Sequence, residues 1–346
     1  MSDLRKARGI MEQIRFSGDT PADDAKNKEI LGAVRDFHLV NELNISRAVT
    51  PSLSKSLDAV INNLSIPPRT IEAFVYASPA IQANCYAGED GCVIRFSSAL
   101  VDILDADEFK FVAGHELGHF LFEHSHEEEE DSVMCFIRQR AREISADRAG
   151  LVACGGSINT AIKAMMKMVS GLTGEHLRFD VGTFLSQLKK SSADSVSIRA
   201  THPPILVRCR ALYWFSLSGY FDDSPKNFSS EQLQKLNERV QTDLSRYVDR
   251  RAEAIIAEVK ESIRMWEAIS DIVKDGKFDK QEQRQFAEAF GHDNLQKLKN
   301  FLGGRSPAVI KSTVAKKLEN VRAKLQELAP EKKETENSEN KVNIPR

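Results

Sequence analysis

Cysteine is scarce in this sequence and forms no paired pattern. No CxxC motif occurs, and the cysteines are odd in number and scattered, at Cys85, Cys92, Cys135, Cys154 and Cys209. A disulfide framework and a thiolate zinc site both need closely spaced or evenly numbered cysteines, so we expect neither. Free thiols persist in a reducing compartment, and we therefore expect a cytoplasmic protein.

Long apolar runs and an excess of one charge sign are also lacking. No segment approaches the roughly 20 apolar residues of a membrane span. The N-terminal stretch MSDLRKARGIMEQIRFSG mixes charged with apolar residues, so we expect no secretory signal. Lys plus Arg number 48 and Asp plus Glu 50, a net charge of −2 that gives no electrostatic reason to expect nucleic acid as a partner.

The pattern along the 346 residues predicts an α+β fold with several regions. We expect an N-terminal helical extension over 1–45, a catalytic domain over 46–222, a helical domain over 223–330 and a disordered tail over 331–346. Strand-like runs at 71–79, 81–87 and 92–96 predict a small antiparallel sheet. Apolar residues at helical spacing over 231–274 predict one long helix or two in series, and more helices fit 280–290, 293–302 and 307–329.

The segment GHELGH carries the clearest chemical signal. Asp105 and Glu108 have capping-box spacing, which predicts a helix from about 106 to 123. His115 and His119 are four residues apart on that helix, so both imidazoles lie on one face and can bind one zinc ion. Glu116 is rotated away from that face and can serve as general base toward the water on the metal.

A zinc site of this kind needs a third protein ligand. The candidates in sequence are His124, His126, the acidic run Glu127–Glu130 and Glu143. The two histidines follow the motif too closely, and the acidic run reads as a solvated turn. We favour Glu143, on a second helix predicted from about Ser132 to Cys154 and closed by Gly155-Gly156, with Asp147 one turn on as the partner of a zinc-bound histidine.

Together, GHELGHFLFEH, EISAD and THPPILVR resemble the gluzincin metallopeptidase family of the HtpX heat-shock protease and the CAAX prenyl protease. The resemblance covers about residues 50–215 and implies the zinc ligands His115, His119 and Glu143. It further implies that His202 stabilises the oxyanion and that Arg208 pairs with a carboxylate near the site. Many relatives are embedded in membranes, whereas this sequence resembles the soluble, intracellular type.

The second half carries no catalytic pattern. The stretch WEAISDIVKDGKFDKQEQRQFAEAFG has a weaker resemblance to TerB-like helical modules. It also matches part of an EF-hand loop from Asp271 to Glu282, but Val273 stands where such loops have an oxygen ligand. We therefore expect a helix–turn–helix and no calcium site.

These observations predict a zinc-dependent metalloendopeptidase that binds one Zn²⁺ per chain and cleaves a protein or peptide substrate. The edge of strand 81–87 is expected to hold that substrate in an extended form. One alternative is a catalytically weak scaffold that binds partners in a stress response through its helical C-terminal half. Another is a zinc hydrolase acting on a non-peptide amide.

Overall fold

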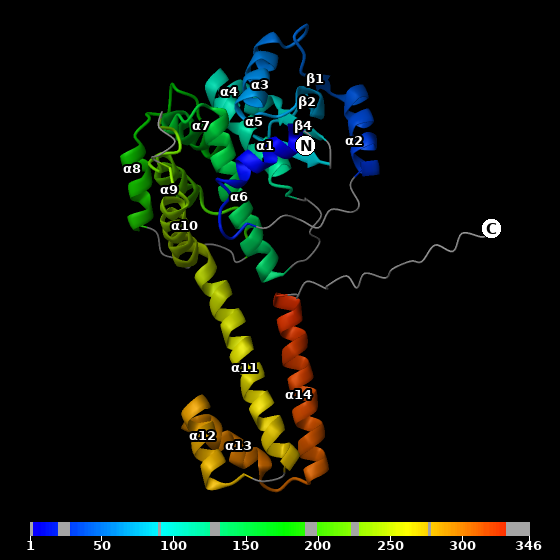
Figure 1. The fold of residues 1–346 in the computed structure, drawn as a ribbon, viewed down its shortest axis with the longest axis vertical. Helices are drawn as coiled ribbons and strands as arrows, with labels where there is room; N and C mark the ends of the chain where they lie inside the picture. Colours follow the sequence, from blue (N-terminus) through cyan, green and yellow to red (C-terminus); the bar gives the residue numbers. More distant parts are fainter. Residues whose placement is uncertain are drawn as a thin grey trace, which may run out of the picture. The chain divides into compact units, whose positions relative to one another are not determined.

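The computed structural model describes residues 3–19, 28–88, 91–124, 132–190, 199–222, 228–275 and 278–329. The chain divides into two compact units, one formed by Met1–Asp131 with Cys135–Arg251 and the other by Ser132–Met134 with Ala252–Arg346. The N-terminal helix therefore belongs to the same unit as the GHELGH motif (Figure 1). No helix in the described ranges is long and apolar enough to cross a membrane.

The helices of the first unit surround a small sheet. In chain order they are α1 Asp3–Glu12, α2 Lys28–Asn41, α3 Pro51–Asn63, α4 Ser98–Ile103, α5 Ala106–Leu121, α6 Val133–Ala153, α7 Ile158–Ser170, α8 Val181–Ser186, α9 Ile205–Ser216 and α10 Ser230–Leu244. Short 3₁₀ turns occupy Pro68–Thr70 and Gln187–Lys190. Helix α10 packs on α9, and this unit extends to Arg251. The domain boundary expected after residue 222 stays a prediction.

The sheet is mixed, which corrects the wholly antiparallel sheet expected from sequence. Its strands are β1 Leu43–Asn44, β2 Ile71–Tyr76, β3 Ala83–Ala87 and β4 Cys92–Ser97, in the spatial order β1-β2-β4-β3. The β3–β4 connection is short, so these two strands are antiparallel. Between β2 and β4 the chain first visits the outer strand β3, so β4 returns parallel to β2. Strand β3 is left at an edge of the sheet.

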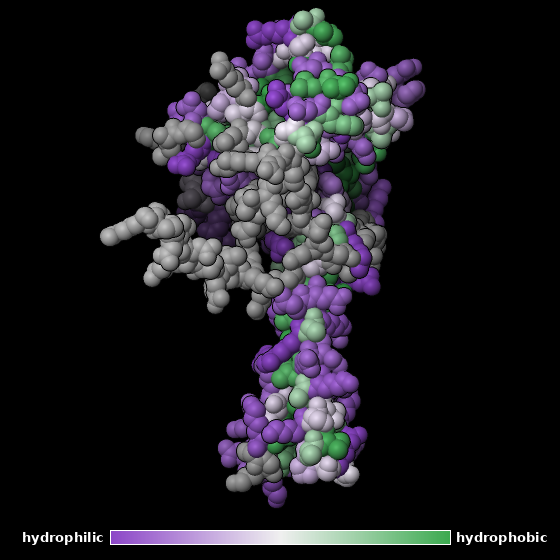
Figure 2. Space-filling model, turned by 90° about the vertical axis from the view of Figure 1, so that its right-hand side faces the viewer, coloured by the Kyte–Doolittle hydropathy of each residue, from purple (hydrophilic) through white to green (hydrophobic). Residues whose placement is uncertain are grey.

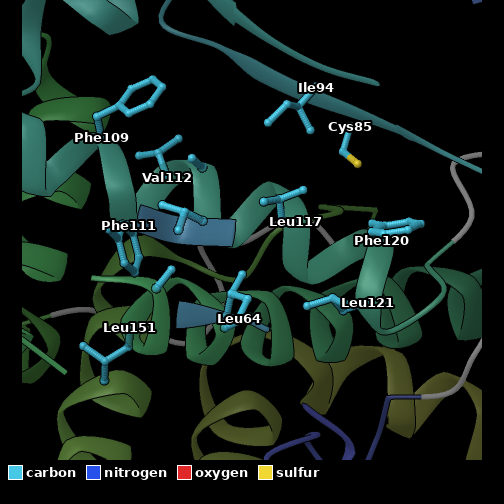
Figure 3. Close-up of a cluster of buried hydrophobic side chains, with 14 of the residues drawn as sticks. Leu64, Cys85, Ile94, Phe109, Phe111, Val112, Leu117, Phe120, Leu121 and Leu151 are labelled. Carbon is cyan, nitrogen blue, oxygen red and sulfur yellow. The ribbon is translucent and has the colours of Figure 1, made fainter. Parts of the chain in front are cut away.

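Helix α5 forms the centre of this unit. It begins at the predicted capping box, in which the Asp105 side chain accepts from the Glu108 N–H and the Glu108 side chain accepts from the Asp105 N–H. Twelve of the 16 residues of α5 are buried, because the sheet covers one side and other helices cover much of the rest. Figure 3 shows Ile94 and Cys85 of the sheet on one side of α5. On the other side lie Leu151 of α6 and the side chain of Leu121, the last residue of α5. The α+β fold class is confirmed, with a core built around the motif helix.

The second unit is all helical. Its helices are α11 Arg250–Asp275, α12 Lys280–Phe290, α13 His292–Leu302 and α14 Pro307–Leu328. Helices α11 and α14 run side by side (Figure 1), and Arg322 pairs with Glu267 at 2.7 Å. A π-helical turn, Ser245–Asp249, joins α10 to α11, so the predicted 231–274 helix is two helices in series. Polar side chains cover most of the visible face of this unit (Figure 2).

The unit has a small core of its own. Its buried residues come from all four helices and are Ile269, Phe286, Leu298, Ile310 and Val314. Nothing in this arrangement tests the TerB-like resemblance, which stays a prediction. The tail 331–346 lies outside the described residues.

Candidate active site

Two glycines of the motif let α6 approach α5 closely. A Cβ on Gly118 would lie 3.0 Å from the Cα of Ala146 and 2.9 Å from the Cβ of Ala149. A Cβ on Gly114 would lie 2.1 Å from the Cβ of Ala153. Carbon atoms in van der Waals contact are about 3.5–4.0 Å apart, so no side chain fits at either position. The two glycines therefore allow α6 to pack closely against α5. This packing places the middle of α6 next to the histidines of α5.

This packing gathers three metal-binding side chains. His115 and His119 from α5 and Glu143 from α6 each offer a donor atom within 4.8 Å of the others, and all three are buried. The two histidine Nε2 atoms are 3.3 Å apart. The Glu143 carboxylate oxygens lie 3.6 Å from His115 Nε2 and 3.5 Å from His119 Nε2.

The spacing of these donors fits zinc. Bonds of about 2.0–2.1 Å from zinc to tetrahedral ligands place neighbouring donors about 3.3–3.4 Å apart. The measured separations, 3.3, 3.5 and 3.6 Å, are close to that value. Two imidazoles and one carboxylate also match the three-ligand sets of catalytic zinc, which leave one position for water or substrate.

His115 has a carboxylate partner on α6. His115 Nδ1 lies 3.0 Å from Asp147 Oδ1. Arg208 from α9 holds Asp147 with two hydrogen bonds, of 2.8 and 2.6 Å. Burial raises the pKa of Asp147, but the Arg208 charge and hydrogen bonds outweigh it and keep that pKa below its usual value. A carboxylate that stays ionised accepts the Nδ1 proton of His115 and leaves Nε2 free to bind a metal.

Glu116 has a different environment from Glu143. It is buried, and no hydrogen bond to its carboxylate occurs within the described part of the chain. Burial raises its pKa to about 7, with the negative charge of Glu143 adding to the effect and His115 and Arg208 opposing it. A carboxyl group with a pKa near neutrality can accept a proton in one step and return it in another.

His202 lies at the open side of the donor cluster. Its Nε2 is 3.4 Å from Glu143 Oε1, and its side chain is 61% exposed. The Thr201 hydroxyl is 2.8 Å from its Nδ1. The carbonyl of Ala200 accepts a hydrogen bond of 2.6 Å from the buried Arg140, which fixes the backbone just before this histidine. His202 is thus the exposed imidazole beside an otherwise buried cluster.

The sequence analysis missed a second pair of residues at the site. His124 follows the motif too closely to be a favoured ligand, yet its Nδ1 lies 2.8 Å from His119 Nδ1. Helix α5 ends in a Schellman turn, in which the His124 N–H bonds to the His119 carbonyl and the Glu123 N–H to that of Phe120. This turn folds His124 back over His119. The other imidazole nitrogen of His124, Nε2, lies 3.0 Å from both carboxylate oxygens of Asp19.

The remaining third-ligand candidates, His126 and Glu127–Glu130, lie outside the described residues. In the partial EF-hand match, Asp279 and Glu282 form a capping box at the start of α12. Asp271 pairs with Lys274 at 2.9 Å. These carboxylates are therefore engaged in helix capping and a surface ion pair, as expected for a helix–turn–helix.

Comparison with known proteins agrees with this geometry. Residues 47–138 match the sequence model of peptidase family M48. This part of the chain is therefore similar to peptidase family M48. The matched segment holds strands β2, β3 and β4, all of α5 and the start of α6. No curated protein matches the chain.

The M48 match ends before Glu143, so the other site residues rest on geometry. Glu143, Asp147 and Arg208 all lie beyond residue 138. Their convergence on the M48 histidines is a property of the fold, since α6 and α9 place them there. The M48 match favours a peptidase, and these contacts are the structural basis for proposing a mechanism.

Proposed function

We propose that this chain is a zinc-dependent metalloendopeptidase, with His115, His119 and Glu143 as ligands of one Zn²⁺. The observation that supports this most directly is the donor spacing of 3.3–3.6 Å in a buried cluster on two helices. Zinc, when bound, supplies Lewis acidity toward a water molecule and a substrate carbonyl. The chain's own residues then supply proton transfer, charge stabilisation and substrate positioning.

Glu116 is the proposed general base. It is adjacent to His115 in sequence but on another face of α5, so it can reach the reacting water without being a ligand. Its carboxylate takes a proton from the attacking water and passes it to the leaving amine.

His202 is the proposed oxyanion donor. Its exposed side chain stands over Glu143, on the side from which a substrate can approach. An N–H aimed at the carbonyl oxygen becomes more strongly bound as negative charge develops there, which lowers the barrier. Asp147 and Arg208 keep His115 oriented and take no direct part in the proton transfers.

The open edge of β3 is the proposed substrate-binding strand. This strand packs on α5, and its outer edge has no partner strand among the described residues. The Gly88 N–H bonds to the Gly91 carbonyl, and the Gln82 carbonyl accepts from the Ser97 N–H. Because amide direction alternates along a strand, the amides of Ala83, Cys85 and Ala87 face outward. They can hydrogen-bond an extended, antiparallel peptide.

The free cysteines support a reducing compartment, and the cytoplasm remains our proposal for where the protein works. A protein partner for the helical C-terminal unit likewise stays a prediction. The scaffold alternative, in contrast, predicts no peptide turnover.

Peptide and casein hydrolysis by the purified chain tests the proposed function. We expect turnover that a zinc chelator abolishes and added Zn²⁺ restores, and that Glu116→Gln lacks. Turnover that resists the chelator would contradict the proposal, and absence of turnover in the zinc-loaded chain would favour the scaffold or a non-peptide substrate. N-terminal proteomics of cells carrying the native or the Glu116→Gln chain then identifies the substrates.

A further inference from the structure

The N-terminal segment 3–19 is built into the peptidase unit. Leu4, Ala7 and Met11 of α1 are buried in the main core. After α1, the chain continues along α6, where the Phe16 N–H donates to Ser145 Oγ at 2.9 Å. The buried Arg148 of α6 donates to the Ile14 carbonyl at 3.0 Å. These contacts fix the backbone that carries Asp19.

Asp19 is at the end of a line of groups that starts at the metal-binding cluster. His119 Nδ1 is 2.8 Å from His124 Nδ1, and His124 Nε2 is 3.0 Å from each Asp19 oxygen. Arg15 lies beyond Asp19, with its Nη1 atom 3.4 Å from Asp19 Oδ1. Both Asp19 and His124 are almost wholly buried.

In this line of groups each hydrogen bond has its donor on the side of His119 and its acceptor on the side of Asp19. His119 points Nε2 at His115 and Glu143, so metal binding through Nε2 requires the His119 proton on Nδ1. That proton is donated to His124 Nδ1, which must therefore be an acceptor. A neutral His124 then carries its own proton on Nε2 and donates it to Asp19. A carboxylate suits the position of Asp19, because either of its oxygens can accept the hydrogen bond from His124 Nε2. An ionised carboxylate also has no proton of its own that it could donate to His124.

His115 and His119 each have a hydrogen-bonded partner at Nδ1. Both sets of partners end in a carboxylate that lies next to an arginine, but they come from different parts of the chain. His115 is held by Asp147, which Arg208 backs. His119 is held by His124 and then Asp19, which Arg15 backs. The first support comes from α6 and α9. The second begins at His124, just after α5, and ends at Asp19 and Arg15, about a hundred residues before the motif in sequence.

We propose that Asp19 is a positioning residue of the metal centre, which acts through His124 to fix the tautomer and orientation of His119. The N-terminal segment is therefore a working part of the peptidase site. This inference rests on the proposed function only in that His119 is a metal ligand. It requires that loss of Asp19 weakens zinc binding even where the fold is intact.

A purely structural role for Asp19 makes a different prediction. Asp19 could matter only because it helps to dock the N-terminal segment, and any equal weakening of that docking would then release zinc equally. Met11→Ala is the matched control, since Met11 is buried in the same segment and is part of the hydrophobic core. It weakens docking without touching His124 or Asp19.

The test measures zinc dissociation from the full chain into excess chromophoric chelator, for the native chain, Asp19→Asn and Met11→Ala. The urea midpoint of each metal-free protein is measured alongside. We expect Asp19→Asn to lose zinc roughly 10–100-fold faster, the usual cost of losing an outer partner of a zinc-bound histidine. Met11→Ala should lower the urea midpoint and leave zinc dissociation within about twofold of native.

A double-mutant cycle adds a second readout. His124→Phe keeps a ring stacked on Phe122 but removes the acceptor for His119, so Asp19→Asn should have no further effect in that background. The proposal is overturned if Asp19→Asn releases zinc at the native rate, if Met11→Ala releases it as fast as Asp19→Asn, or if the two changes are additive. A native chain that holds zinc but cleaves nothing refutes the proposed function alone. One that holds no zinc refutes both.

Discussion

Gly118 of α5 and Ala146 of α6 are in direct contact, with only 3.0 Å between an ideal Cβ on Gly118 and the Ala146 Cα. This contact sets the distance between the helix that carries His115 and His119 and the helix that carries Glu143. The glycines of GHELGH therefore have a packing role that decides whether a third ligand reaches the histidines.

Replacing either motif glycine should separate the two helices. We expect Gly118→Ala and Gly114→Ala to lower the free energy of unfolding by about 1–3 kcal/mol, the usual cost of overpacking a core. Both should also weaken zinc binding. Gly9→Ala is the matched control, because Gly9 lies in helix α1 with nothing within 4 Å of its would-be Cβ. It should raise stability by about 0.5–1 kcal/mol. Urea unfolding of all three variants checks this, and equal behaviour would count against the packing role.

The raised pKa of Glu116 predicts a pH effect in the metal-free protein. Glu116 has a pKa of about 7 in the fold, against 4.5 for an ordinary Glu. Between these values the folded chain holds a proton that the unfolded chain releases, so its free energy of unfolding falls as pH rises. Each pH unit across this window costs about 1.4 kcal/mol, so roughly 3 kcal/mol is lost by pH 8.

Glu116→Gln cannot ionise and should escape this loss. Unfolding of both metal-free proteins in urea, from pH 4 to pH 8, measures the difference. We expect the stability of Glu116→Gln relative to native to rise between pH 4.5 and 7 and to level off above. A difference that stays constant over this range would show that Glu116 has an ordinary pKa.

Substrate binding at β3 can be tested with proline, because proline removes a backbone N–H. Asn84 and Tyr86 are unsuitable positions, since the alternation of the ladder directs their N–H groups to β4. Ala83→Pro removes an outward-facing donor instead. We expect a several-fold rise in KM with zinc content unchanged, whereas Ala83→Val, which keeps the N–H, should leave KM near native. Equal KM values for the two variants would argue against binding along this edge.

Calcium should not bind the segment from Asp271 to Glu282. Val273 offers no oxygen ligand, and the carboxylates of Asp279 and Glu282 already cap α12. Lys274 adds a positive charge at the loop and pairs with Asp271. Calorimetry on the full chain should show no micromolar calcium isotherm. One that appears and is lost in Glu282→Gln would make calcium a candidate regulator.

The sequence predicted much of the site because its signals are local. The capping box at Asp105, the i, i+4 histidines and the glycine pair after α6 each follow from short-range spacing. Glu143 could be proposed as the third ligand because the distance in sequence from His119 allows the first helix to end, the chain to reverse and a second helix to return past the histidines. The parallel β2–β4 pairing could not be predicted, since strand order depends on long-range contacts that leave no mark in the strands themselves.

Asp19 and His124 could not be predicted for a similar reason. The turn that folds His124 back depends on Glu123, which adopts a φ of +58°, where Gly is the usual residue. Without glycine at that position, the sequence carries no sign of the Schellman turn. Asp19 meets His124 across more than a hundred residues, and only the docking of α1 brings them together.

Zinc content and peptide turnover, measured on the same preparations of native, Glu116→Gln and Glu143→Ala chains, test the main claim most directly. We predict one zinc per native chain with turnover. Glu116→Gln should keep its zinc and lose most turnover, because it removes a base and no ligand. Glu143→Ala should lose both. If Glu143→Ala instead binds zinc with native stoichiometry and affinity, Glu143 is not the third ligand and the proposed metal centre is wrong.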